Sequence, residues 1–209
     1  MVKKYVVKTT GRTGSHIITE YFYKKGFIAY QDYGDYNYNT VEEMALIALS
    51  FLPGEKQYDR DAVERYLTNN IVVHSHRIDW LPNDIENFNL IISLRRNKML
   101  QTLSKIVSMN TRQNTKYPKK LESNSIHIDP DKFLRKLYKS KAEDNKLQGI
   151  VNKGWLSVQE IYYEDPLGIN LDLPDILDDY YVEKSNIDYE QVVSNYDELR
   201  LIYNGLDLE

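Results

Sequence analysis

The order of elements at the start of the chain constrains the fold most. Residues 4–9 form a short β-rich run that contains Tyr5-Val6-Val7, and the turn Gly11-Arg12-Thr13-Gly14-Ser15 follows it. From residue 16 to residue 25 the apolar side chains recur at helical spacing. A strand, a glycine turn and a helix in this order predict the first unit of an α/β fold.

The same alternation continues along the chain. Further strands are predicted at residues 27–30, 71–76, 90–94 and 158–163, and helices at residues 40–52, 61–68, 99–107, 130–148 and 189–202. The strands at 71–76 and 90–94 are almost continuously apolar, as is typical of strands buried on both faces of a parallel sheet. We therefore predict a single α/β domain over residues 1–209, with a mainly parallel central sheet flanked by helices, a P-loop-like turn after the first strand, and an acidic C-terminal extension from about residue 167.

Composition excludes several classes of protein. The 209 residues include 31 acidic and 27 basic side chains and are 42% hydrophobic, which is too balanced for a disordered chain. There is no cysteine, and this excludes disulfide frameworks, thiolate metal sites and thiol nucleophiles. The longest uncharged apolar stretch, residues 44–53, is too short to cross a membrane. The N-terminus lacks the apolar run of a secretory signal, so we expect a cytoplasmic protein that does not engage a membrane.

The charges are distributed unevenly. Residues 95–153 contain 15 Lys and Arg against 5 Asp and Glu, a net of +10, whereas residues 160–209 contain 2 against 14, a net of −12. The basic third of the chain could hold an anion. Two solvated faces, or a basic segment packed on an acidic one, would explain the same pattern.

The glycine turn is the first candidate site. It lies between the carboxyl end of a predicted strand and the amino end of a helix, where free N–H groups and the helix dipole favour an anion. Thr13 and Ser15 add hydroxyl donors, and Arg12 adds a forked cation that suits phosphate or sulfate oxygens. The turn is not a Walker A loop, because no lysine follows Gly14. An ordinary tight turn is the competing interpretation.

A second candidate site follows the strand at 90–94. Arg96 is separated by eight residues from Ser104, which is a little over two turns if the segment is helical. The two side chains could then share a side of the helix and hold a second anion, with Arg95 nearby. Alternatively, Arg96 caps a surface helix and Ser104 is solvated.

The third candidate is the histidine pair at the end of the strand at 71–76. Alternation along a strand places His74 and His76 on one face. A histidine in a cleft at the carboxyl end of a strand is suited to act as a general base near neutral pH. Metal ligation and a structural role are the alternatives, and the absence of an evident third ligand weakens the metal interpretation.

Together these elements resemble the sulfotransferases that use 3′-phosphoadenosine 5′-phosphosulfate (PAPS). The family's phosphosulfate turn, of the type [K/R]-[S/T]-G-[S/T]-[S/T], is similar to Arg12-Thr13-Gly14-Ser15-His16. Its 3′-phosphate motif, R-N-P followed after five residues by S, is similar to Arg96-Asn97 through Ser104, with Lys98 in place of the proline. The resemblance implies that Gly11, Arg12, Thr13, Gly14, Ser15 and His16 bind the phosphosulfate, and that Arg96 and Ser104 bind the 3′-phosphate.

Two further motifs extend the resemblance over roughly residues 4–166. His74-Ser75-His76 before Leu81-Pro82 is similar to the family's K-T-H before L-P, which implies that His76 is the catalytic base. Tyr162-Tyr163-Glu164-Asp165 looks like a late strand that ends in Y-E-D, which implies that Tyr163 stacks near the adenine. The chain departs from the family at His16, which replaces a hydroxyl, and in lacking a C-terminal R-K-G clamp.

The expected activity is therefore transfer of a sulfuryl group from PAPS to an acceptor hydroxyl or amine. We expect His76 and Arg12 to be catalytic, a small molecule or carbohydrate to be the acceptor, 3′-phosphoadenosine 5′-phosphate (PAP) to be the product, and no metal to be required. A kinase-like phosphoryl transferase and a non-catalytic nucleotide- or RNA-binding module are the alternatives. The acidic pI and the spread of basic residues over several elements disfavour nucleic acid. The acceptor's identity and the oligomeric state do not follow from the sequence.

Overall fold

The computed structural model describes residues 2–13, 15–31, 39–40, 68–76, 78, 81–82, 85–111, 125–164 and 187–206. The chain forms two compact units. The first comprises Met1–Leu94 and Glu143–Tyr180, and the second comprises Arg95–Ala142 and Tyr181–Glu209. Helix α5 (Pro130–Gln148) contributes to both units, because the division falls between Ala142 and Glu143. The prediction of one domain over the whole chain stays a prediction.

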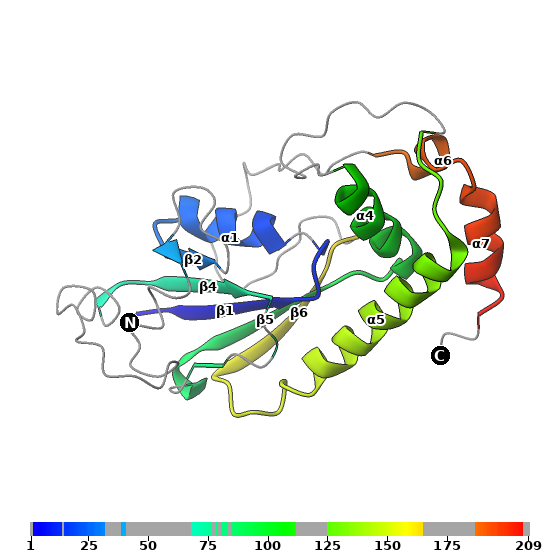
Figure 1. Ribbon diagram of the computed structural model, residues 1–209. Helices are drawn as coiled ribbons and strands as arrows, with labels where there is room; N and C mark the ends of the chain where they lie inside the picture. Colours follow the sequence, from blue (N-terminus) through cyan, green and yellow to red (C-terminus); the bar gives the residue numbers. More distant parts are fainter. Residues whose placement is uncertain are drawn as a thin grey trace, which may run out of the picture. The chain divides into compact units, whose positions relative to one another are not determined.

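The first unit is built on an all-parallel sheet of six strands in the order β3-β2-β4-β1-β5-β6 (Figure 1). The strands are β1 (Lys4–Thr9), β2 (Ile28–Gln31), β3 (Asn39–Thr40), β4 (Ile71–Ser75), β5 (Asn89–Leu94) and β6 (Ser157–Tyr162). The predicted α/β class with a parallel sheet flanked by helices is therefore confirmed. A short 3-10 helix, η1 (Ile85–Asn87), precedes β5.

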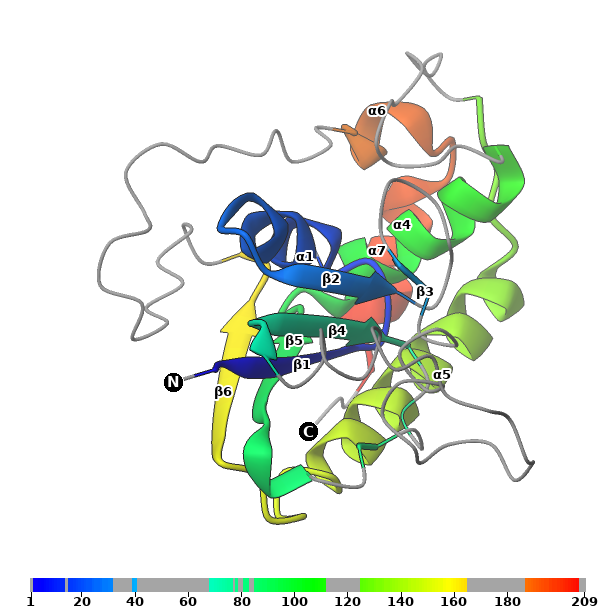
Figure 2. The same cartoon turned by 90° about the vertical axis from the view of Figure 1, so that its left-hand side faces the viewer.

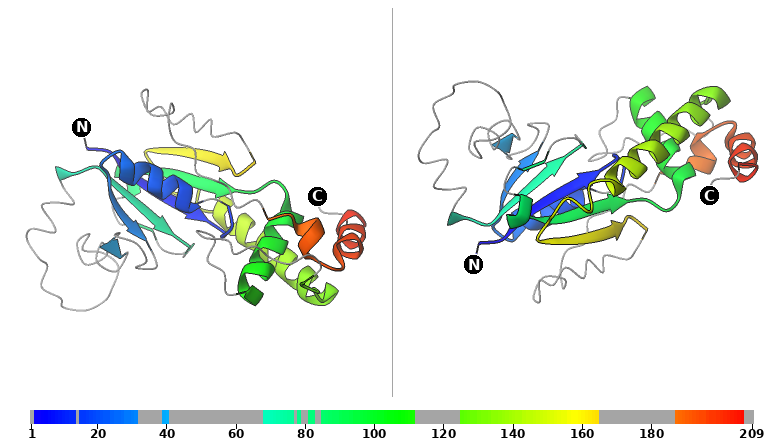
Figure 3. Two further views of the ribbon diagram at one scale, coloured as in Figure 1. Left: turned by 90° about the horizontal axis from the view of Figure 1, so that it is seen from above. Right: turned by 90° about the horizontal axis from the view of Figure 1, so that it is seen from below.

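Helix α1 (Ser15–Lys24) covers one face of the sheet, as Figure 2 and Figure 3 show. Its buried side chains Ile18, Tyr21 and Phe22 pack against Val7 and its neighbours on β4 and β5. The helix ends at a glycine, Gly26, whose φ of +79° is a left-handed conformation that terminates many helices.

The opposite face of the sheet is covered by the end of α5 and the segment after it. Leu147, Ile150 and Trp155 pack against the side chains of β1, β4 and β5 that point away from α1. Trp155 is fixed in place by its indole N–H, which donates to the Ile150 carbonyl over 2.8 Å. Both faces of β4 and β5 are thus buried, which explains why these strands are continuously apolar.

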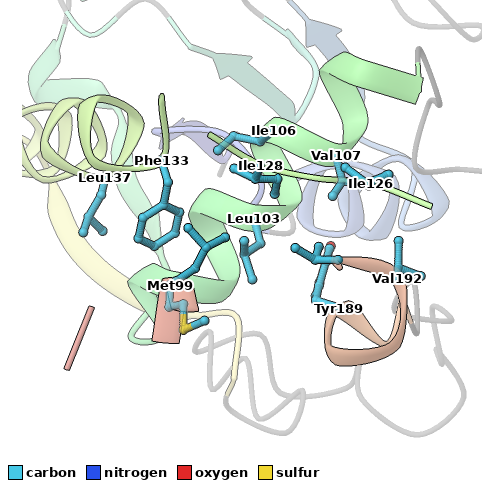
Figure 4. Packing of buried hydrophobic residues seen from close by; sticks show 12 residues of the cluster. Met99, Leu103, Ile106, Val107, Ile126, Ile128, Phe133, Leu137, Tyr189 and Val192 are labelled. Carbon is cyan, nitrogen blue, oxygen red and sulfur yellow. The ribbon is translucent and has the colours of Figure 1, made fainter. Parts of the chain in front are cut away.

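The second unit has a helical core. It contains α4 (Lys98–Thr111), the first part of α5, α6 (Tyr189–Val192) and α7 (Tyr196–Asn204). Figure 4 shows side chains of α4, α5, α6 and the segment at 126–128 turned toward one another. The described part of the acidic C-terminal region is therefore packed, with Tyr189, Val192 and Leu199 buried in this core.

The single helix predicted at residues 189–202 is wrong, because the chain leaves the helical conformation between α6 and α7, with an extended Val193 and a turn at residues 194–195. Val193 pairs with Ile126 in an isolated parallel bridge. Asn195 then binds the backbone of Ile128 twice: its Oδ1 accepts from the N–H over 3.1 Å and its Nδ2 donates to the carbonyl over 2.8 Å. These pairings compete with helical hydrogen bonds and interrupt the helix.

Several predicted segments lie outside the described residues. They include the helices predicted at 40–52 and 61–68, apart from Thr40, which belongs to β3, and Thr68. In the described parts of the chain, no helix combines the length and the apolar character needed to cross a membrane.

Candidate functional site

The carboxyl ends of the parallel strands meet at one edge of the sheet, and the candidate residues of the first unit gather there. Strands β2, β3 and β4 lie on one side of β1, whereas β5 and β6 lie on the other. The connection that follows β1 leads to β2 on one side of the sheet, whereas the connection that follows the adjacent β5 leads to β6 on the other side, and parallel sheets bind ligands at such a point. The turn follows β1, His76 follows β4, and Tyr163 follows β6.

The turn after β1 has two successive left-handed residues. Gly11 has a φ of +80°, and Arg12 has a φ of +60°. For a residue with a Cβ this conformation costs about 1–2 kcal/mol. Such strain persists only where neighbouring groups fix the backbone, and it is concentrated at ligand sites. Helix α1 begins at Ser15, so the turn leads into a helix N-terminus as predicted.

Part of the turn is outside the described residues. Gly14 and the side chains of Ser15 and His16 are not among them, so the P-loop-like shape and the roles of these three residues stay predictions. Thr13 is described and is only 2% exposed. Its hydroxyl shares a hydrogen bond with the Thr9 hydroxyl, so in this structure it serves the turn itself.

Several hydrogen bonds hold the described part of the turn. The Gly11 N–H donates to Thr9 Oγ1 over 3.0 Å, and the bond between the Thr9 and Thr13 hydroxyls closes the segment. The Ser93 hydroxyl on β5 donates to the Thr13 carbonyl over 2.7 Å. The Thr10 hydroxyl donates to Asp144 Oδ1 on α5 over 2.9 Å.

The two histidines at the end of β4 are in contact. Their ring centroids are 4.6 Å apart and the rings are nearly perpendicular, at 71°. His74 is 1% exposed, whereas His76, one residue beyond the strand, is half-buried. The prediction that both lie on one face is confirmed by this contact, and the difference in exposure favours His76 as the residue that a substrate can reach.

Strand register places His74 on the same face of the sheet as Thr9 and Ser93, which support the turn. Val7 is paired with His74, and Thr9 with Ser93. Paired residues of parallel strands point to the same face. Because Val7 packs against α1, the side chains of Thr9, Ser93 and His74 all point to the α1 face.

Three polar residues next to the turn were not singled out by the sequence. Ser93 is fully buried under the turn, and Asp144 reaches it from α5. Lys8 is also fully buried, and it is paired in register with Ser75 on the face away from α1. The sequence around Lys8 did not show that its strand is buried on both faces, because apolar residues flank it on one side only. Ser93 sits at the end of such a strand, whereas nothing in the sequence around Asp144 marks it.

The second candidate anion site belongs to the second unit. Arg95 is buried and Arg96 is exposed, and both precede α4. Asn97 caps that helix, because its Oδ1 accepts from the Leu100 N–H over 2.9 Å. Ser104 is only 4% exposed, so the alternative of a solvated serine is excluded. Since Arg96 lies before the first helical residue, helical spacing does not relate Arg96 to Ser104.

Tyr163 extends the pairing between β6 and β5 by one residue, at the sheet edge where the carboxyl ends of the strands meet. It follows β6, its N–H donates to the Leu94 carbonyl over 2.9 Å, and its side chain is half-buried. The structure thus places Tyr163 beside the carboxyl end of β5. Its proposed contact with an adenine stays a prediction.

Comparisons with known proteins do not assign the chain. No protein-family model matches it, and no curated protein matches its sequence. Within the described residues, no three His, Asp or Glu side chains form a group that could hold a metal ion.

Proposed function

We propose that the chain is a sulfotransferase, which moves a sulfuryl group from PAPS to an acceptor hydroxyl or, less favourably, an amine. One observation carries the proposal: Thr9 and Ser93, which support the turn after β1, share one face of one sheet edge with the His74–His76 pair, on the neighbouring strands β4, β1 and β5. An anion-binding turn beside an accessible imidazole is what a group transfer from an anionic donor requires. The resemblance of the motifs to PAPS-dependent enzymes supports the same reaction.

In the proposed reaction His76 accepts the proton of the acceptor hydroxyl. The acceptor oxygen forms a bond to sulfur as the bond between sulfur and the bridging phosphate oxygen breaks, and PAP leaves. Arg12 stabilises the negative charge that develops on that bridging oxygen. The N–H groups of the turn and of the helix N-terminus, with Ser15 and His16, bind the 5′-phosphosulfate.

The rest of the donor has proposed contacts as well. Arg96 and Ser104 bind the 3′-phosphate, and Tyr163 stacks on the adenine. Protein cations and N–H groups supply the charge that Mg²⁺ supplies in phosphoryl transfer, so the reaction requires no metal. The acceptor is a small molecule or a carbohydrate.

A nucleotide-dependent phosphoryl transferase is the second candidate function. The observation that favours it is Asp144, whose carboxylate lies 2.9 Å from the Thr10 hydroxyl in the turn. Magnesium ions in such enzymes are bound through one or two carboxylates together with phosphate oxygens. The missing P-loop lysine disfavours this candidate.

Thermal unfolding with a panel of ligands tests the proposal. PAP alone should raise the melting temperature, and Mg²⁺ should add nothing. At 100 times its dissociation constant PAP should contribute about 2.7 kcal/mol of apparent stability. A shift with ATP and Mg²⁺ but not with PAP would replace the sulfotransferase with the kinase-like candidate, and a shift with oligonucleotides alone would indicate a binding module. Transfer of labelled sulfuryl groups from PAPS to a broad acceptor panel then tests catalysis directly.

A further inference from the structure

We propose that Asp144 and Ser93 are positioning residues that hold the turn after β1 in its ligand-binding conformation before any ligand arrives. The inference rests on the proposed function in taking the turn as the site of the donor's 5′-phosphosulfate. Neither the motifs nor the resemblance indicated these two residues. Their proposed role is to hold the backbone of the turn, and they do not contact the donor.

The backbone of the turn needs such support. Gly11 and Arg12 are both left-handed, and Arg12 has a Cβ that disfavours this conformation. Arginine has no intrinsic preference for the left-handed conformation, so the residue itself does not hold the backbone in it. Contacts from outside the segment must therefore fix it.

Two contacts from other elements are placed on either side of the strained pair. Thr10, before Gly11, donates to Asp144, and Thr13, after Arg12, accepts from Ser93 through its carbonyl. Thr10 is 8% exposed, and both ends of the second contact are buried, with Thr13 2% exposed and Ser93 fully buried. The Ser93–Thr13 hydrogen bond is buried and the Thr10–Asp144 hydrogen bond is partly buried. Such bonds are costly to leave unmade, so they restrain both ends of the strained segment.

A turn that is already ordered binds its ligand more tightly, because the cost of ordering has been met during folding. Loss of either contact should let the turn relax toward ordinary backbone angles. The N–H groups that receive the 5′-phosphate would then be misaligned, and Arg12 would be displaced. Ligands bound only through a 3′-phosphate should be unaffected.

The experiment measures binding of PAP, adenosine 5′-monophosphate and adenosine 3′-monophosphate by calorimetry. The variants are Thr10→Val, Thr10→Ser, Asp144→Ala and the double variant Thr10→Val with Asp144→Ala. Thr10→Val keeps the shape of the side chain and removes the hydroxyl, whereas Thr10→Ser keeps the hydroxyl. Ser93→Ala tests the second contact, and Asn145→Ala, an exposed neighbour on α5, is the matched control.

We expect Thr10→Val and Asp144→Ala each to weaken PAP and the 5′-monophosphate about tenfold or more, the range for loss of a hydrogen bond to a charged group. The double variant should be no weaker than the weaker single variant, because both substitutions remove the same Thr10–Asp144 hydrogen bond. Thr10→Ser and Asn145→Ala should stay within about twofold of the original chain, and binding of the 3′-monophosphate should not change. A merely structural role would lower thermal stability and weaken all three ligands alike.

The outcomes separate this inference from the proposed function. PAP binding that is unchanged in Thr10→Val and Asp144→Ala, or equal losses for the 5′- and 3′-monophosphates, would overturn the inference alone. If the original chain binds ATP with Mg²⁺ and not PAP, the sulfotransferase proposal fails, and the same losses measured with ATP in Thr10→Val and Ser93→Ala, which both keep the Asp144 carboxylate, would still support the positioning role. A chain that binds neither nucleotide would overturn both.

Discussion

Arg12 adopts a left-handed backbone conformation that a glycine would adopt without strain. The matched variants Arg12→Gly and Arg12→Ala both lack the guanidinium, but only Arg12→Ala keeps a Cβ at a φ near +60°. We expect Arg12→Gly to be more stable than Arg12→Ala by about 1 kcal/mol. Urea unfolding of the two variants measures this difference. Equal stabilities would mean that the backbone at Arg12 is not strained.

The two histidines differ in exposure, and this predicts different kinetic effects. His76→Ala should lower kcat by about 10²- to 10⁴-fold, the usual contribution of a positioned base, with little change in PAP affinity. His74 is 1% exposed and packs against the His76 ring, so His74→Ala should lower kcat less and thermal stability more. Single-turnover transfer from PAPS and thermal unfolding measure both effects. A larger loss of kcat in His74→Ala than in His76→Ala would mean that His74, and not His76, is the base.

At the level of elements, periodicity predicted the strands and helices of the described chain well. The strand at 4–9 and the helix at 130–148 have the predicted bounds, and most others differ by a residue or two. Apolar spacing is sufficient for most of these elements because they bury a continuous face. It failed at residues 193–195, because the partner of Asn195 is the backbone of Ile128, which is 67 positions away. The supports of the turn were missed for the same reason, since Ser93 and Asp144 meet Thr13 and Thr10 only in the folded sheet.

Helix α1 offers a prediction on the pH dependence of stability. Burial, and to a lesser extent the nearby Tyr5, raises the pKa of Tyr21 above its ordinary value of about 10. The folded chain therefore keeps this proton at a pH where the unfolded chain loses it. The resulting stabilisation is complete below pH 10 and declines as the pH rises through the higher pKa of the folded state.

Tyr21→Phe keeps the ring and removes the titration. The variant should lose less stability than the original chain between pH 9 and about 11. Urea unfolding across this range measures the difference, and Tyr23→Phe, at an exposed position on the same helix, is the control. Identical slopes for Tyr21→Phe and the original chain would contradict the assignment.

At the level of the whole molecule, the proposed function divides donor binding between two arginines that are far apart in the sequence. Arg96 is proposed to bind the 3′-phosphate equally in the ground and transition states, so Arg96→Ala should mainly raise the apparent KM for PAPS. Arg12→Ala should instead lower kcat by about 10²- to 10³-fold, because it removes a donor to developing charge. Steady-state kinetics with PAPS as the varied substrate separates the two effects. The same kinetic signature in both variants would contradict the division.

The buried Lys8 has a practical consequence for following the unfolding of this protein. Its side chain is fully buried within β1, between two neighbouring strands, whereas lysines such as Lys139 and Lys146 lie at the surface. An amine-reactive label in solution can acylate the surface lysines of the native chain, but it reaches the Lys8 amine only after the centre of the sheet has opened. The extent of acylation at this one position therefore reports the opening of the sheet, and the surface lysines provide an internal standard for the reagent.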